Sequence, residues 1–321
     1  MYESFYGVRE RPFDLTPNPR FLLLTGKHRE ALSNLQYGLT SRRGLTVLVG
    51  EAGTGKTTLI RAAVAEFEAQ GAVIAYLNNP TLTRQEFCEF LTQGFGLDQS
   101  AGSSKTRLLS ALASVLENFK AKGIQTGLII DEAQVLPNEL LEEVRLLANI
   151  ETETDKLLPI VLAGQPELAD RLNQPSLRQL KQRVALRCQL NALDARETAE
   201  YIAGRIKIAG GNSVLVFTRQ AVDAIHQRAG GIPRLISVIC DNALISGFAA
   251  DRRPVTRDIV DDVCRDFDLL GGASSLAQQA AEPVAAAVKP THVEEAEPDE
   301  KETLRRSLFE HFTIRRRFSL F

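Results

Sequence analysis

One short stretch constrains this chain more than any other. Residues 50 to 57 read GEAGTGKT and fit the pattern G-x-x-x-x-G-K-[ST] at every defined position. An apolar run, Leu45–Val49, precedes the stretch, and a helix-forming run, Thr58–Gln70, follows it. Strand, glycine-rich turn and helix in this order predict a loop whose backbone N–H groups surround nucleotide phosphates. A glycine-rich turn without a ligand is the alternative, and the flanking strand and helix disfavour it.

The side chains of this loop predict both a nucleotide and a metal. We expect Lys56 to contact β- and γ-phosphate oxygens, and we expect the Thr57 hydroxyl to bind Mg²⁺. The predicted cofactors are therefore ATP and Mg²⁺. The residues predicted to hold the nucleotide are Gly50, Glu51, Ala52, Gly53, Thr54, Gly55, Lys56, Thr57 and Thr58.

Two adjacent carboxylates follow a second apolar run. Leu128, Ile129 and Ile130 lead directly into Asp131 and Glu132. Ligands bind at the carboxyl ends of strands in a parallel sheet. We therefore expect Asp131 to hold Mg²⁺ and Glu132 to act as general base on the attacking water. Acidic residues also solvate strand ends without a catalytic role, but an Asp–Glu pair downstream of a complete phosphate-binding loop favours catalysis.

Apolar runs alternate with amphipathic helical patterns as far as residue 190. The predicted strands are Leu45–Val49, Val73–Leu77, Gly127–Ile130, Leu158–Ala163 and Val184–Leu190. The predicted helices are Lys27–Ser41, Thr58–Gln70, Arg84–Phe95, Lys105–Lys120 and Pro137–Ile150. This alternation predicts an α/β fold in which helices cover both faces of a parallel sheet of short, fully apolar strands. The strand Val73–Leu77 lies between the two motifs, which marks the additional-strand, catalytic-glutamate branch of P-loop proteins.

Strand patterns stop after residue 190, and helical patterns continue. They cover Asp194–Ala209, Thr218–Ala229, Pro233–Phe248 and Thr256–Phe267. These patterns predict a small, all-helical second domain. The predicted domain bounds are 1–44 for an N-terminal segment of the ATPase module, 45–190 for the ATPase core and 191–268 for a helical lid.

Composition changes again after residue 268. Residues 269–301 are rich in alanine, proline, glutamine and acidic residues, which is typical of a disordered linker. In residues 302–321, the apolar Leu304, Leu308 and Phe312 alternate with arginines and predict a basic amphipathic tail. Such a tail binds an anionic membrane surface or docks on a partner, and an unstructured basic end fits the same pattern.

Bulk properties exclude few partners. The 38 basic and 40 acidic residues give a formal net charge of −2, which disfavours DNA mildly but leaves room for a local basic face. Cys88, Cys188, Cys240 and Cys264 show no metal-binding spacing and are typical of a reducing compartment. We see no signal-peptide pattern and no apolar run of about 18 residues that would span a membrane. We therefore expect a cytoplasmic protein.

The N-terminal segment carries the most specific resemblance to known proteins. Its telling stretches are MYESFYG at 1–7, PFDLTPNPRF at 12–21, HREAL at 28–32 and the pair Tyr37–Gly38. With the two motifs, they resemble the AAA+ ATPase module of the general secretion pathway protein A (ExeA-like) family. The resemblance runs to about residue 268. It implies a P-loop NTPase of the AAA+ type, with a parallel five-stranded sheet flanked by helices and a small all-helical lid.

The resemblance also implies catalytic roles beyond the two motifs. Gln165 resembles the polar sensor after the fourth strand, whose amide orients the lytic water or contacts the γ-phosphate. A turn residue before a proline is the simpler interpretation. Residues 177–184 resemble the segment that presents an arginine finger to the next subunit. Arg183 is the first choice for that finger and Arg178 the second, whereas a solvated basic helix face is the alternative.

Arg234 resembles the second sensor, which reaches the γ-phosphate from the lid. It stands in the sequence GGIPR at residues 230–234, where glycine and proline suit a helix start in any case. An exposed arginine without a ligand is the alternative. A finger in trans implies a homo-oligomer, so we expect assembly to complete the active site.

The resemblance suggests a pathway less firmly than it suggests a motor. Secretion members of the family often continue into a membrane helix and a peptidoglycan-binding domain, and these residues show neither pattern. We expect an ATP-hydrolysing assembly or energising factor for a secretion or cell-envelope export system, peripheral at the inner membrane through its tail. The alternatives are a DNA-dependent ATPase of the transposition-regulator type and an ATP-binding switch with little turnover.

Overall fold

The computed structural model describes residues 1–14, 19–21, 25–41, 44–78 and 80–267. The linker predicted at 269–301 and the basic tail predicted at 302–321 lie outside these residues. Leu304, Leu308 and Phe312, on which the tail prediction depends, therefore have no structural account.

Within the described residues, parallel strands form a five-stranded sheet in the order β2-β3-β4-β1-β5. The strands are β1 (Leu45–Gly50), β2 (Val73–Leu77), β3 (Thr126–Ile130), β4 (Ile160–Gly164) and β5 (Val184–Leu190). The predicted fold class is confirmed. In space, β4 separates the strands of the two motifs, β1 and β3. The strand β2, which lies between the motifs in the sequence, is instead at the edge of the sheet.

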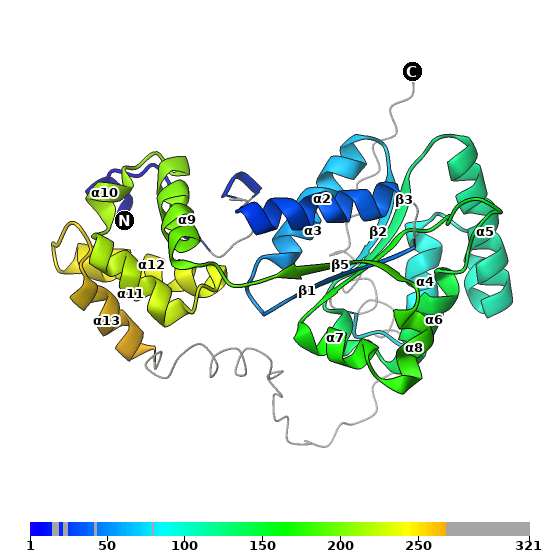
Figure 1. Ribbon diagram of the computed structural model, residues 1–321. Coiled ribbons are helices and arrows are strands. Elements are labelled where there is room, and N and C mark those ends of the chain that lie inside the picture. The colour runs from blue at the N-terminus through cyan, green and yellow to red at the C-terminus, as the bar shows by residue number, and fades with distance from the viewer. Residues whose placement is uncertain (15–18, 22–24, 42–43, 79, 268–321) are drawn as a thin grey trace, which may run out of the picture. The chain divides into compact units, whose positions relative to one another are not determined.

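Alternate residues of the central strands face opposite sides of the sheet, as the period of a β-strand requires. In β3, Leu128 and Ile130 enter one apolar cluster and Ile129 enters another. Helices α2 (Gly26–Thr40) and α3 (Lys56–Ala69) cover the Ile129 side. The opposite face is covered by α4 (Arg84–Gly94), α5 (Lys105–Ala121), α6 (Asn138–Leu147), α7 (Pro166–Leu172) and α8 (Arg178–Lys181). Figure 1 shows α2 and α3 on one side of the sheet and α6, α7 and α8 on the other.

The edge strand β5 departs from the prediction that every strand is fully apolar. Cys188 and Leu190 are buried, but Ala185, Arg187 and Gln189 are exposed. Among the strands of this sheet, β5 pairs only with β1. An edge strand has neighbours on one side only, so it tolerates the alternating pattern that the buried central strands do not.

Helix boundaries differ from the predicted ones mainly around proline and in short segments. Pro137 is the N-cap of α6 rather than its first residue, and the helix ends at Leu147 instead of Ile150. The amide of the C-cap, Ala148, donates to carbonyls of that last turn, which closes the helix there. The short helices α7 and α8 were not predicted, because each is too short for a clear helical period.

The region predicted to form the helical lid is a bundle of helices that begins at a capping box. Asp194 accepts a hydrogen bond from the Glu197 amide, and the Glu197 carboxylate accepts one from the Asp194 amide. The helices are α9 (Ala195–Ile208), α10 (Ser213–Val216), α11 (Arg219–Ala229), α12 (Pro233–Ala249) and α13 (Arg257–Asp266). The prediction missed α10, which is a single turn. No helix among the described residues has the length and apolarity needed to cross a membrane.

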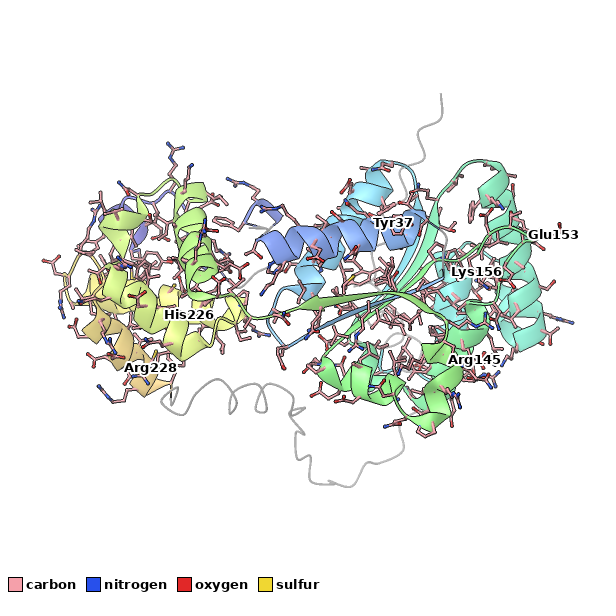
Figure 2. All side chains as sticks on the ribbon, in the orientation of Figure 1. Tyr37, Arg145, Glu153, Lys156, His226 and Arg228 are labelled. Carbon is pink, nitrogen blue, oxygen red and sulfur yellow. The ribbon has the colours of Figure 1, made fainter. Side chains whose placement is uncertain are left out.

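Polar contacts join the lid helices to one another, and Figure 2 labels two of the residues. His226 Nδ1 of α11 lies 2.9 Å from the Thr198 hydroxyl of α9. Arg228, also on α11, pairs with Asp261 of α13 at 3.1 Å. These contacts tie α11 to its neighbours on two sides.

The N-terminal segment is divided between two apolar clusters. Tyr2, Tyr6, Val8, Phe13 and Phe21 belong to the lid cluster, together with buried residues of α9, α11, α12 and α13. The short helix α1 (Glu3–Tyr6) is part of this region. Helix α2, in contrast, packs on the sheet. A single N-terminal segment therefore contributes to the packing of both the lid and the core.

A buried arginine fastens this segment to the lid. The Nε of Arg205 donates to the Pro12 carbonyl at 2.6 Å, and its NH2 group donates to the Asp14 carbonyl at 3.3 Å. The guanidinium also lies over the rings of Phe13 and Phe21, at 6.0 and 5.2 Å from their centroids. The carbonyl groups satisfy a charge that burial would otherwise make costly.

Candidate nucleotide site

The predicted phosphate-binding loop joins β1, which ends at Gly50, to α3, which begins at Lys56. Two of its glycines hold backbone angles that other residues rarely adopt: Gly53 has φ +81° and Gly55 has φ +101°. Thr54 closes the turn, because its hydroxyl donates to the Glu51 carbonyl at 2.8 Å. The first turn of α3 therefore meets the loop with its free N–H groups, which is the usual geometry of an anion site.

Lys56 is buried inside this loop. Its Nζ donates to the carbonyls of Gly50 at 2.8 Å and Glu51 at 3.0 Å. Burial lowers the pKa of Lys56, although the carboxylates of Glu132 and Asp131 act in the opposite direction. A buried ammonium beside backbone N–H groups can pair with a phosphate anion that binds in the loop.

Thr57 and Asp131 meet as predicted for a metal site. The Thr57 hydroxyl donates to Asp131 Oδ2 at 2.6 Å, and Asp131 is completely buried at the end of β3. A hydroxyl and a carboxylate are the hard oxygen ligands that Mg²⁺ prefers. The described residues hold no cluster of three or more His, Cys, Asp or Glu side chains for a metal. Two protein oxygens nevertheless fit Mg²⁺, which usually completes its shell with phosphate and water oxygens.

Tyr76 of β2 supports Asp131 from the neighbouring strand. Its hydroxyl lies 3.4 Å from Asp131 Oδ2, the oxygen that also accepts from Thr57. Burial and the Asp131 charge raise the pKa of Tyr76 to about 12, so the phenol remains a donor at neutral pH.

Glu132 stands at a strained turn directly after Asp131. Its backbone has φ 52° and ψ 36°, in the left-handed region that non-glycine residues seldom adopt. Two side-chain amides reach the same carboxylate oxygen, Oε2: Gln134 at 2.6 Å and Gln165 at 3.4 Å. The structure therefore brings the predicted general base and the predicted sensor together. Gln134 was not singled out by the sequence, because it belongs to no motif.

Other parts of the chain hold the loop from both sides. The Arg234 amide donates to the Gly53 carbonyl at 3.2 Å, while the Arg234 side chain is exposed. From α2, His28 Nε2 lies 3.1 Å from the Thr54 carbonyl, and its Nδ1 lies 2.9 Å from the Thr25 hydroxyl. A carbonyl only accepts, so Nε2 carries the donated proton. His28 appeared in the N-terminal resemblance without a role, and the structure gives it this contact.

Arg183 is the predicted residue that the structure does not bring to the loop. It immediately precedes β5, whose Val184 pairs with Leu45 at the start of β1. Gly50 lies at the other end of β1, and five steps of about 3.3 Å place the two sheet edges roughly 17 Å apart. Arg183 therefore lies at the opposite edge from its own phosphate-binding loop. Arg178, the second choice, is exposed on α8.

The family comparison agrees with the fold and the site. Residues 39–172 match the sequence model of the family described as AAA domain. The chain accordingly has the fold of an AAA+ P-loop NTPase. In the order β2-β3-β4-β1-β5, both motifs stand at the carboxyl ends of their strands.

Among proteins with this fold, the chain is similar to the general secretion pathway protein A of Aeromonas hydrophila. The two sequences are 41% identical over 249 residues, which cover 78% of this chain and 45% of that relative. The resemblance predicted from the N-terminal segment is thereby confirmed. Because the chain spans less than half of that relative's length, the likeness concerns the shared part only.

Solved structures show the same fold at low sequence identity. The ORC2 protein of Aeropyrum pernix, solved as ADPNP–ADP complexes, superposes with a TM-score of 0.59 and 19% identity, over 80% of this chain and 71% of that chain. The Cdc6p protein of Pyrobaculum aerophilum gives a TM-score of 0.59 and 17% identity, over 79% and 70% of the two chains. At these identities the likeness concerns the fold alone.

Proposed function

We propose that the protein binds Mg·ATP and hydrolyses it to ADP and phosphate. The observation that carries the proposal is the hydrogen-bonded set at one edge of the sheet. Within it, Thr57 contacts Asp131, and Glu132 is held by the amide of Gln165. A loop for phosphate, two oxygens for a metal and an oriented carboxylate are the parts that phosphoryl transfer to water requires.

The residues divide the work as follows. The amides of the loop and Lys56 bind the β- and γ-phosphates, and the buried position of Lys56 keeps water away from them. Thr57 and Asp131 hold Mg²⁺, which neutralises the charge that develops on the phosphate oxygens. Glu132 accepts the proton of the attacking water, and Gln165 orients the carboxylate or the γ-phosphate.

Arg183 lies at the far edge of the sheet from the phosphate-binding loop of its own chain. We propose that Arg183 acts in trans, on the nucleotide of a neighbouring subunit, so that an oligomer completes each site. Arg234 acts from the lid of the same subunit, where its amide already contacts the loop. Loss of the γ-phosphate would release the Arg234 side chain and allow the lid to move.

For the biological role, we propose an assembly or energising factor of a secretion or cell-envelope system. The support is the 41% identity to general secretion pathway protein A. By this proposal the protein works at the cytoplasmic face of the inner membrane and binds there peripherally, with residues 302–321 as the contact.

The first experiment measures steady-state ATPase activity of the wild type and of Glu132→Gln over a series of protein concentrations. We expect a specific activity that rises with concentration in the wild type, and a loss of about 10²- to 10⁴-fold in Glu132→Gln with nucleotide binding retained. Equal activity of the two proteins would refute the assignment of Glu132. Tight binding without turnover in either would leave a nucleotide switch.

The same series repeated with duplex DNA addresses the alternative function. One protein of this fold, the Drosophila ORC, was solved bound to DNA, at 20% identity to this chain. A rise in ATPase activity that weakens steeply with salt would favour a DNA-dependent ATPase. An unchanged rate would favour the envelope proposal, as the net charge of −2 does.

A further inference from the structure

The side chain of Gln134 occupies a position between two proposed functional residues. Its Nε2 donates to Glu132 Oε2 at 2.6 Å, and its Oε1 accepts from the backbone amide of Gln165 at 3.1 Å. A backbone N–H can only donate and a carboxylate can only accept, so the two contacts fix which end of the amide faces which partner. Gln134 therefore joins the turn after β3 to the N-terminus of α7.

The two amides leave the Glu132 carboxylate asymmetric. Gln134 and Gln165 both donate to Oε2, whereas Oε1 accepts no hydrogen bond from the residues that the structure describes. A carboxylate oxygen that already accepts two donors is a poor proton acceptor compared with its free partner. The arrangement leaves Oε1 as the oxygen available to accept a proton from an attacking water.

The surroundings are shaped to hold the Gln134 side chain. A Cβ atom at Gly164 would lie 2.6 Å from Gln134 Oε1, so the glycine at the end of β4 leaves the space that the amide occupies. Arg171 of α7 binds the Gln134 carbonyl, and its NH2 group donates to Asn138 Oδ1 at 2.7 Å. The amide thus lies against β4 on one side, and its backbone is anchored to α7 on the other.

We propose that Gln134 is a positioning residue for hydrolysis: it fixes the rotamer of the proposed base and couples it to the sensor on α7. The inference rests on the proposed function, because it assumes that Glu132 is the base. Gln134 acts through Glu132, whose left-handed backbone turn would otherwise leave the carboxylate several rotamers.

A purely structural role for Gln134 predicts a different outcome from a positioning role. If the amide only stabilised the turn, its replacement would lower thermal stability and would affect nucleotide binding and turnover together. If it positions the base, its replacement lowers kcat and leaves nucleotide affinity unchanged.

The decisive variant is Gln134→Glu, compared with Gln134→Ala. The glutamate retains an oxygen for the Gln165 amide but places a second carboxylate against Glu132. Like charges at hydrogen-bond distance repel each other, so we expect Gln134→Glu to displace the Glu132 carboxylate and to lower kcat at least as far as Gln134→Ala does, with mant-ADP affinity retained.

The experiment measures kcat, KM and mant-ADP affinity between pH 6 and 9 for the wild type, both Gln134 variants, Gly164→Ala and the control Val135→Ala. Val135 is the next residue in the turn and is 50% exposed. We expect Gln134→Ala to lose about 10- to 100-fold in kcat with mant-ADP affinity within about 2-fold of wild type, in line with the loss of a hydrogen bond to a charged group. The kcat of Gly164→Ala should also fall, by a smaller factor, and the kcat of Val135→Ala should match that of the wild type.

The outcomes separate this inference from the proposed function. Wild-type kcat in either Gln134→Ala or Gln134→Glu would overturn the inference, while an inactive Glu132→Gln would keep the proposed function intact. Wild-type activity in Glu132→Gln would remove the proposed function itself. A parallel loss of mant-ADP affinity and melting temperature in Gln134→Ala would reduce Gln134 to a structural residue and would also overturn the inference.

Discussion

The two edges of the sheet differ in the proposed functional groups that one chain places there. At the carboxyl edge, the Thr57 hydroxyl of α3 bonds Asp131 after β3, and the Gln165 amide at the start of α7 bonds the neighbouring Glu132. At the amino edge, Arg183 precedes β5, whose Val184 pairs with Leu45, at the other end of β1 from Gly50. Parallel strands bring all their carboxyl ends to one edge, so one chain can assemble the first group but not deliver Arg183 to it. This difference is the basis for the proposal that Arg183 acts on the nucleotide of a neighbouring subunit.

Among the variants that distinguish the two edges, the Arg183 variant should show the largest loss of ATPase activity. We expect Arg183→Ala to lose about 10³-fold or more in kcat, the usual contribution of an arginine finger, while ATP affinity stays near wild type. The matched control is Arg187→Ala, because Arg187 is exposed on the same strand. Steady-state ATPase assays at high protein concentration measure the effect. Equal losses in the two variants would mean that charge on this surface, rather than a finger, matters.

Removing the Thr57 hydroxyl tests the carboxyl edge. We expect Thr57→Ala to require more Mg²⁺ for half-maximal activity and to lose roughly 10- to 100-fold in rate, because one of the two proposed protein oxygens is gone. Thr57→Ser keeps the hydroxyl and should behave like the wild type. A Mg²⁺ titration that is identical in wild type and Thr57→Ala would place the metal elsewhere.

Replacing Arg234 in the lid should have a smaller effect, a loss of ATP affinity. Arg234→Ala keeps the backbone bond to Gly53, since the amide makes it, and removes only the exposed guanidinium. We expect ATP affinity to fall about 10-fold and ADP affinity to stay unchanged, because the proposed contact is with the γ-phosphate. Arg196→Ala, on the exposed surface of α9, is the control. Equal losses for ATP and ADP would contradict a γ-phosphate sensor.

The smallest effect is a pH dependence that follows from burial of Lys56. Its pKa is lowered, and phosphate binding needs the protonated form, so ATP affinity should weaken as pH rises through that lowered pKa, before an ordinary lysine titrates. Stability without nucleotide should change in the opposite sense. The unfolded chain binds more protons in this window, so raising the pH favours the folded state. Calorimetric titration with ATP from pH 7 to 9.5 measures the affinity, and we expect it to fall a few-fold over this range.

Lys56→Arg supplies the control for this pH dependence. Its guanidinium stays protonated throughout the range, so its ATP affinity, even if weaker, should not vary with pH in the same way. A wild-type affinity that is constant up to pH 9.5 would contradict the lowered pKa.

The motif residues could be predicted because their chemistry is local in the sequence. The loop at 50–57 needs only its own glycines and the following helix, and Asp131–Glu132 needs only the end of a buried strand. Even the position of Arg183 at the amino edge follows from its place just before a parallel strand. The class and fold that these features imply are confirmed by the sheet order and the AAA domain match.

The contacts made by Gln134 and His28 could not be predicted, because they depend on tertiary structure. Gln134 reaches Glu132 only because the backbone turns left-handed at that residue, and it meets Gln165 across the gap between β3 and β4. His28 reaches the Thr54 carbonyl from a helix that precedes the loop by many residues. Neither side chain has a pattern of spacing that would indicate such a contact.

The sequence pattern also did not predict that the N-terminal segment packs partly with the lid and partly on the sheet. Phe13 and Phe21 were assigned to a segment of the ATPase module, but they pack in the lid cluster and against Arg205 of α9. Aromatic residues near prolines show no period that would tell which domain they join. Only the resemblance indicated that this segment is distinctive.

The most direct test of the account mixes two inactive variants. Glu132→Gln keeps Arg183 but lacks the base, whereas Arg183→Ala keeps the base but lacks the finger. If the finger acts in trans, mixed oligomers contain interfaces with an intact Glu132 on one side and an intact Arg183 on the other, roughly a quarter of the total at equal ratio. The account therefore predicts that ATPase activity reappears on mixing and is greatest near equal amounts. No activity at any ratio, with both variants binding ATP and forming mixed oligomers by mass photometry, would contradict it.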